Sequence, residues 1–274
     1  MARRTPAGCC DSSRAAAPDR RPVAPAITAV ALEGLPEVRA GDDPGGLIAA
    51  AMPPGAPAAS DVLVVAHKFI SKAEGRTRAL SQVAVTPRAR SLAGELDKDP
   101  RHVQVVLDET REVRRATRGV LISETYHGFV CANAGVDASN TPDDDTVILL
   151  PVDPDDSARR LRAGLRGRLG VAPAVLITDS FGRAWRHGQV DVAIGCAGLA
   201  PLEDWRGRVD ARGRELRATW IAVADELAAA ADLARAKDAM QPAVLISGAG
   251  RHVTSDDGPG AIALLRDAGT DLFR

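Results

Sequence analysis

The chain has 274 residues, a length that fits one large domain or two small ones. Its 35 basic and 36 acidic residues leave a formal net charge of −1, which argues against a nucleic-acid-binding protein that relies on bulk positive charge. Aromatic residues make up 3% of the sequence, too few for a base-stacking platform. No apolar run approaches the ~20 residues of a membrane-spanning helix, so we expect neither a nucleic-acid partner nor a membrane.

The first 25 residues differ in composition from the rest of the chain. They are rich in Pro, Ala, Arg and Ser and lack the apolar core of a secretory signal. We therefore expect a disordered tail over residues 1–25 and a folded unit over residues 26–274. The cysteines, Cys9, Cys10, Cys131 and Cys196, have neither a disulfide-framework nor a zinc spacing. This predicts a reducing cytoplasm, with Cys131 and Cys196 buried and inert.

Apolar runs and capping residues predict the elements in chain order. Strands are expected at 27–32, 61–66, 119–123, 128–132, 147–152, 174–178 and 243–247. A polar cap followed by proline predicts helices that begin at Pro44, Pro87 and Pro154, and the third should end near residue 169. Further helices are expected over 100–117, 220–236 and 261–267. Strands and helices do not alternate regularly, and neither a repeat nor a linker is visible, so the sequence predicts one mixed α/β (α+β) unit.

The common phosphate-binding and hydrolase motifs, among them G-x-x-x-x-G-K-[ST], G-x-G-x-x-G and G-x-S-x-G, are absent from the sequence. What remains is three polar clusters, each after an apolar strand. The first, HKFISKAEGR at 67–76, contains Lys68 and Lys72, two of only four lysines beside 31 arginines. A compact ammonium suits phosphate oxygens, so this cluster predicts a phosphate contact; a solvated surface loop is the alternative.

The other two clusters combine oxygen ligands with arginines. NAGVDASN at 133–140 contains Asp137 and Asn140, whose hard oxygens suit Mg²⁺ or Mn²⁺, although such residues also form ordinary turns. In TDSFGRAWRHGQ at 178–189, Asp179 and Ser180 follow the clearest buried strand, where α/β sheets place their ligands. Two arginines follow and could form bidentate hydrogen bonds with phosphate or carboxylate oxygens. The third cluster predicts a metal and phosphate site, with a capped turn bearing surface arginines as the alternative.

Five ordered blocks together resemble one family. GLPEVRAGDD, DVLVVAHKFISKAEGR, CANAGVDASN, ITDSFGRAWRHGQVDVAIG and DWRGRVDARGREL resemble the coenzyme F420-0:L-glutamate ligases, the F420 gamma-glutamyl ligases, as a stand-alone ligase domain. The resemblance implies a GTP-dependent ligase that joins L-glutamate to the lactyl carboxylate of the deazaflavin precursor and then adds further γ-linked glutamates. It also implies a family-specific α/β fold in an intertwined homodimer, with Mg²⁺ or Mn²⁺ at two sites and K⁺.

The family's functional positions fall on residues of this chain. The resemblance implies catalytic roles for Asp137, Asp179 and Lys72, and metal ligation by Asp137, Asp179 and Ser180. The GTP contacts that it implies are Leu35, Pro36, Glu37, Val38, His67, Lys68, Lys72 and Asn140. We also expect Arg183 and Arg186 to contact substrate.

The chain departs from the family's pattern at two positions. Archaeal relatives tend to carry a small hydroxyl residue at His67, and Lys237 stands where they have an acid that ligates the second metal. The flavin-binding domain of two-domain relatives is not expected after Arg274. Two other interpretations remain: a non-catalytic GTP-binding protein, and a ligase of a different acceptor or amino acid.

Overall fold

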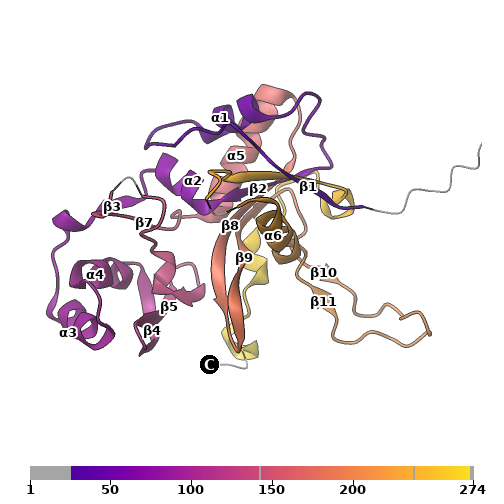
Figure 1. Cartoon of the computed structure of the whole chain (residues 1–274). Coiled ribbons are helices and arrows are strands. Elements are labelled where there is room, and N and C mark those ends of the chain that lie inside the picture. The colour runs from indigo at the N-terminus through magenta and orange to yellow at the C-terminus, as the bar shows by residue number, and fades with distance from the viewer. Residues whose placement is uncertain (1–25, 142, 237, 272–274) are drawn as a thin grey trace, which may run out of the picture.

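The largest sheet in the computed structural model has five strands in the order β1-β12-β2-β8-β9 (Figure 1). The structure describes residues 26–141, 143–236 and 238–271, so the predicted tail over residues 1–25 lies outside it. β2 and β8 run parallel, and the other neighbouring strands run antiparallel. The strands are β1 (Thr28–Ala31), β2 (Val62–Ala66), β8 (Ala174–Arg183), β9 (Arg186–Ala197) and β12 (Ala243–Ser247).

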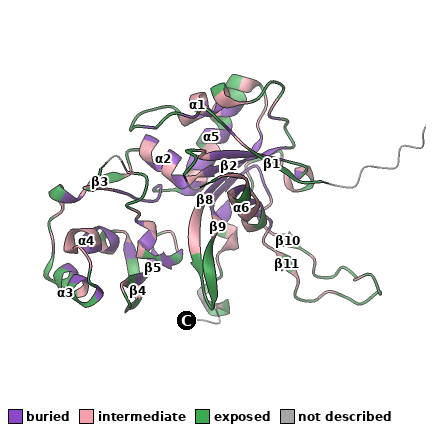
Figure 2. Cartoon of the chain, in the orientation of Figure 1, coloured by how far each residue is buried: buried purple, intermediate pink, exposed green. Residues whose placement is uncertain are grey.

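Helices cover both faces of this sheet, which explains its continuous apolar runs. On one face, Leu63 and Val65 pack with α1 (Pro44–Ala51), α2 (His67–Ala73) and α5 (Pro154–Leu169). On the other face, Val62 and Val64 pack with α6 (Val223–Ala234). Figure 2 shows the buried strands between these helices. The predicted mixed α/β architecture is confirmed.

A second group of elements contains α3, α4 and a three-stranded antiparallel sheet. They are α3 (Pro87–Leu96), α4 (Pro100–Asp108), β4 (Thr110–Thr117), β5 (Val120–Thr125) and β6 (Val130–Ala132). The predicted helix over 100–117 is therefore wrong beyond Asp108. The Thr110 hydroxyl donates to the Val106 carbonyl at 2.6 Å, and the chain then pairs with β5. Fully buried Glu124 of β5 forms ion pairs with Arg111 and Arg114 of β4. The spacing of apolar residues, on which the helix was predicted, does not indicate this cross-strand pairing.

Three other elements are shorter than predicted. The expected strand over 147–152 is β7 (Thr146–Ile148), which pairs with β3 (Thr77–Ala79). The expected helix over 220–236 begins at Val223, because the residues before it form β11 (Trp220–Ile221), paired with β10 (Glu203–Asp204). The expected helix over 261–267 is a 3-10 turn, Ala261–Leu264. Among the described residues, no helix has the length and apolarity needed to cross a bilayer.

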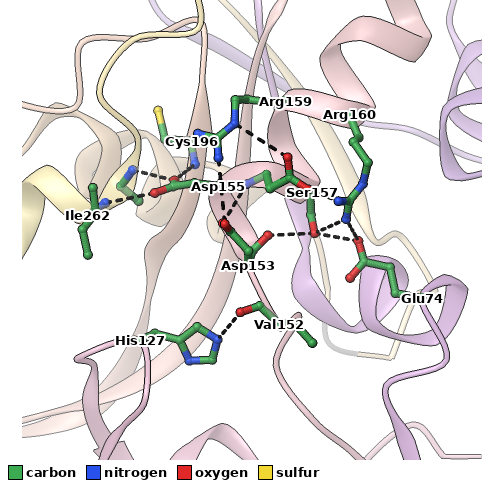
Figure 3. Close-up of polar contacts among 12 residues, drawn as sticks. Glu74, His127, Val152, Asp153, Asp155, Ser157, Arg159, Arg160, Cys196 and Ile262 are labelled. Carbon is green, nitrogen blue, oxygen red and sulfur yellow. Dashed lines mark hydrogen bonds and ion pairs between the residues drawn. The ribbon is translucent and has the colours of Figure 1, made fainter.

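The first turns of α5 fix the end of α2 (Figure 3). Glu74 directly follows the last residue of α2. Ser157 and Arg160 both donate to its carboxylate, at 2.6 and 2.7 Å. Asp155 accepts a hydrogen bond from the Cys196 backbone N–H of β9 at 2.8 Å. These contacts hold α2 in a fixed place against the sheet.

Both described cysteines are buried free thiols, as predicted. Burial raises the pKa of Cys131 and that of Cys196 to about 12. Each thiol is therefore protonated at neutral pH and unreactive as a nucleophile.

Candidate functional site

One cavity of about 630 Å³ lies where the parallel strands β2 and β8 end. Ligands bind at this edge of a sheet in many α/β proteins. The predicted nucleotide and metal residues all line it: Leu35, Pro36, Glu37, Val38, His67, Lys68, Lys72, Asp137, Asn140, Asp179 and Ser180. Residues separated by up to 145 positions in the sequence thus meet in one place.

The first polar cluster forms α2, where the sequence suggested a loop. Phe69 and Ile70 are buried against the sheet, and this packing favours a helix although Ala66 offers no side-chain cap. Lys68 and Lys72 are four residues apart, so they lie on the same face of α2. That face lines the cavity.

Both lysines pair with carboxylates of the cavity. Lys68 Nζ lies 2.6 Å from Asp137 Oδ2 and donates to Ser139 Oγ at 2.6 Å. Lys72 donates to the carboxylate of Glu37. Burial opposes ionisation of Asp137, but the hydrogen bonds from Lys68 and the Ser139 backbone N–H outweigh it and lower the pKa of Asp137. Asp137 is therefore a carboxylate at neutral pH.

Asp179 is oriented by its neighbours. The Ser180 backbone N–H donates to Asp179 Oδ1 at 2.8 Å. His67, whose side chain is 2% exposed, has Nε2 3.3 Å from the same oxygen and Nδ1 3.2 Å from Ser71 Oγ. The Nε2 atom lies outside hydrogen-bonding geometry in this arrangement. His67 thus lies beside the Asp179 carboxylate. Its direct contact with a nucleotide stays a prediction.

An ion pair of the cavity wall was not predicted from the sequence. Asp191 on β9 and Arg235 directly after α6 form an ion pair, and both line the cavity. Their side chains are 1% and 9% exposed. The available signal was an aspartate within the apolar run Val190–Ile194, since a charge inside a buried strand needs a partner.

The two arginines predicted to contact substrate are not among the residues that line the cavity. β8 and β9 continue past it as a hairpin, and Arg183 and Arg186 lie exposed at the turn. Arg183 donates to the His187 carbonyl at 2.7 Å. Their contact with substrate stays a prediction. Lys237 lies outside the described residues, whereas Asp238 beside it lines the cavity.

The carboxylate and hydroxyl oxygens of the cavity suit a hard divalent cation as ligands. Its described lining holds five carboxylates and three Lys or Arg side chains, an excess of two negative charges. No group of three or more His, Cys, Asp or Glu side chains among the described residues is arranged to hold a metal. Mg²⁺, however, is commonly held by one or two carboxylates together with substrate phosphates. Asp137, Asp179 and the Ser180 hydroxyl form a set of that kind.

Comparisons with known proteins cover most of the chain. The family model described as F420-0:Gamma-glutamyl ligase matches residues 34–248, a range that includes every described residue lining the cavity. Coenzyme F420:L-glutamate ligase of Methanothermobacter thermautotrophicus is 43% identical over 252 residues, 90% of this chain and 99% of that protein. The proteins of the same name from Methanopyrus kandleri and Haloarcula marismortui are 45% and 41% identical, over 87% and 89% of this chain and 94% of each relative.

Proposed function

Because the chain belongs to the F420-0:gamma-glutamyl ligase family, we propose that it joins L-glutamate to the lactyl carboxylate of coenzyme F420-0 at the expense of GTP, and then adds further γ-linked glutamates. The names of the relatives supply the acceptor and the amino acid. The observation that supports a nucleotide-dependent reaction is the meeting of the predicted GTP and metal residues in one cavity. Its volume of about 630 Å³ is ordinary for a small-molecule site.

The basic residues of α2 would bind the phosphates. Lys68 and Lys72 would exchange their carboxylate partners for phosphate oxygens, which are stronger acceptors with more charge. Asp137, Asp179 and Ser180 would hold Mg²⁺ or Mn²⁺, which when bound neutralises charge on the transferring phosphoryl group. The proposal includes a second divalent site and K⁺.

The proposed reaction has two steps. An oxygen of the acceptor carboxylate attacks the γ-phosphorus, the bond between that phosphorus and the β–γ bridging oxygen breaks, and GDP leaves with an acyl phosphate formed. The glutamate amine then attacks the acyl carbon and inorganic phosphate leaves, while the amine loses a proton. Neither step needs a side-chain nucleophile. The protein's part is to position the reactants and to neutralise charge.

GDP release measured with and without L-glutamate and coenzyme F420-0 tests the proposal. We expect release that depends on both, together with a mass increase of the acceptor by one or more glutamyl units. GTP binding without release would favour the non-catalytic interpretation. Release that requires another amino acid or acceptor would identify a ligase of different specificity.

The arm formed by residues 203–221 supports the proposed intertwined homodimer. It extends from the sheet with β10 and β11 at its base (Figure 1). Val209 and Trp220 on it are 64% and 51% exposed, and a partner subunit would cover such apolar side chains. Sedimentation analysis should give a dimer for the wild type and a monomer for Val209→Asp. A monomeric wild type would contradict the homodimer.

A further inference from the structure

The ion pair in the cavity wall contacts a predicted metal ligand. Asp191 lies directly opposite Ser180 in the β8–β9 ladder, and the Ser180 hydroxyl donates to Asp191 Oδ1 at 2.6 Å. The other carboxylate oxygen accepts from the Thr178 hydroxyl at 2.9 Å and from Arg235. One buried carboxylate therefore organises two hydroxyls of β8 and one guanidinium.

The direction of the Ser180 hydrogen bond decides what its oxygen can do. A carboxylate oxygen can only accept, so the hydroxyl must be the donor, and a hydroxyl has a single hydrogen. With that hydrogen held by Asp191, the Ser180 oxygen can act toward the cavity only through its lone pairs. Lone pairs are what a cation needs, and a hydrogen aimed at the cation would oppose binding.

We propose that Asp191 is a positioning residue that fixes the Ser180 hydroxyl as a ligand for the divalent cation of the cavity. Asp191 is itself 1% exposed, so it acts through Ser180. Arg235 supplies its counter-charge and also donates to the Pro242 carbonyl at 3.3 Å. The inference rests on the proposed function, because it assumes that the cavity binds a divalent cation.

A purely structural role for the pair predicts a different outcome. Burying two charges costs solvation, and well-packed apolar residues often replace such a pair without loss of stability. Groups that orient a metal ligand, in contrast, typically change metal affinity 10- to 100-fold when they are replaced. Metal affinity therefore separates the two roles better than stability does.

Titration of the protein with Mn²⁺, alone and with GDP bound, read from the EPR signal of free Mn²⁺, tests the inference. We expect Asp191→Asn and Ser180→Ala each to weaken Mn²⁺ binding about 10- to 100-fold. The double variant should bind within about twofold of Ser180→Ala, because Asp191 acts through that hydroxyl. Asp232→Asn is the matched control, since Asp232 also faces Arg235, at 3.7 Å, but does not line the cavity. It should bind Mn²⁺ as the wild type does.

A second variant separates metal affinity from folding. Asp191→Asn alone removes the buried carboxylate that pairs with Arg235, so Asp191→Asn with Arg235→Gln removes both charges of this pair. We expect this neutral pair to recover thermal stability but not Mn²⁺ affinity. Wild-type Mn²⁺ affinity in the neutral pair, or additive losses in the Asp191 and Ser180 double variant, would overturn the inference alone. Failure of the wild type to bind Mn²⁺, both alone and with GDP bound, would overturn both the inference and the proposed metal site.

Discussion

The cavity wall and the protruding arm contain the same kind of ion pair in opposite surroundings. In the wall, Asp191 and Arg235 are 1% and 9% exposed, and 44 residues separate them in the chain. In the arm, Asp204 and Arg206 are 48% and 50% exposed and lie two residues apart. Figure 2 shows the arm as largely exposed. The first pair joins distant elements, whereas the second is a local contact of one turn.

A strong local interaction is no measure of structural importance. The side-chain hydrogen bond from Arg206, followed by the one from its backbone N–H, lowers the pKa of Asp204 to about 2. Water nevertheless surrounds both groups, and it screens their attraction when the chain is folded. The buried pair lacks this screening, so removing one member deprives a buried charge of its charge-assisted hydrogen bond beside the cavity. We expect function and stability to depend on the wall and not on the ion pair of the arm.

Neutralising the metal-binding carboxylates should give the largest effect. Asp137→Asn and Asp179→Asn should each abolish GDP release while the circular dichroism spectrum and melting curve stay close to those of the wild type, because the cation loses a charged ligand. Asp204→Asn in the arm is the matched control and should retain activity. Unchanged turnover in either cavity variant would remove that residue from the site.

Lys72 should have the next largest effect. Its ammonium lines the cavity and its side chain is 11% exposed, so Lys72→Ala should lower kcat/KM for GTP by about 10- to 150-fold. Lys72→Arg should recover only part of this, because a planar guanidinium does not fit a site for a point charge. Steady-state kinetics with varied GTP at saturating L-glutamate gives the answer. Values for Lys72→Ala within about twofold of the wild type would show that its pairing with Glu37 is a surface contact only.

The two ion pairs can be compared directly through stability. Arg235→Met should lower the free energy of unfolding by roughly 3–5 kcal/mol, because it removes the guanidinium that pairs with the buried Asp191 carboxylate. Arg206→Met should leave the urea midpoint unchanged, since its partner stays hydrated. Urea unfolding followed by circular dichroism measures both. Equal losses would contradict the contrast between wall and arm.

The smallest effect is expected from the buried thiols. In a variant with Cys9 and Cys10 replaced by serine, Cys131 and Cys196 should not react with a thiol reagent at about pH 7.5 until the protein unfolds. Burial raises the pKa of each thiol from its ordinary value of 9.0 to about 12. The neutral form is thus favoured in the folded state, so this contribution to stability is complete below about pH 9 and is lost as pH rises from 9 toward 12. Rapid labelling of the folded variant at neutral pH would show that the interior opens readily.

The central strands and most helix starts could be predicted from the sequence. Val62–Val65 and Ala174–Ile177 form continuous apolar runs because both faces of the sheet are covered. Pro44, Pro87 and Pro154 each occupy the first helical position, as predicted. Such signals are local, so they can be recognised in the sequence without knowledge of the tertiary structure.

The remaining features depend on long-range contacts. The predicted helix over 100–117 is confirmed for Pro100–Asp108 and wrong beyond it, because Val113 fits a helical period whereas pairing with β5 decides its conformation. The resemblance to the family identified eleven cavity residues, but neither Asp191 nor Arg235. Their pairing follows from the β8–β9 register and from the position of the end of α6. No local sequence pattern predicts that register or that position.

The position of β12 has a consequence for the order in which the chain can fold. β12 lies between β1 and β2, so the N-terminal strand has no hydrogen-bonded neighbour in the described sheet until residues 243–247 have been synthesised. Until then β2 also presents an open apolar edge, which is the kind of edge that promotes aggregation. Closing the sheet joins residues more than 200 positions apart, and the entropy cost of closing so long a loop makes this step slow. A nascent chain that stops before residue 243 would leave Thr28–Ala31 unpaired in the described sheet, so residues up to 247 must leave the ribosome before this sheet is complete.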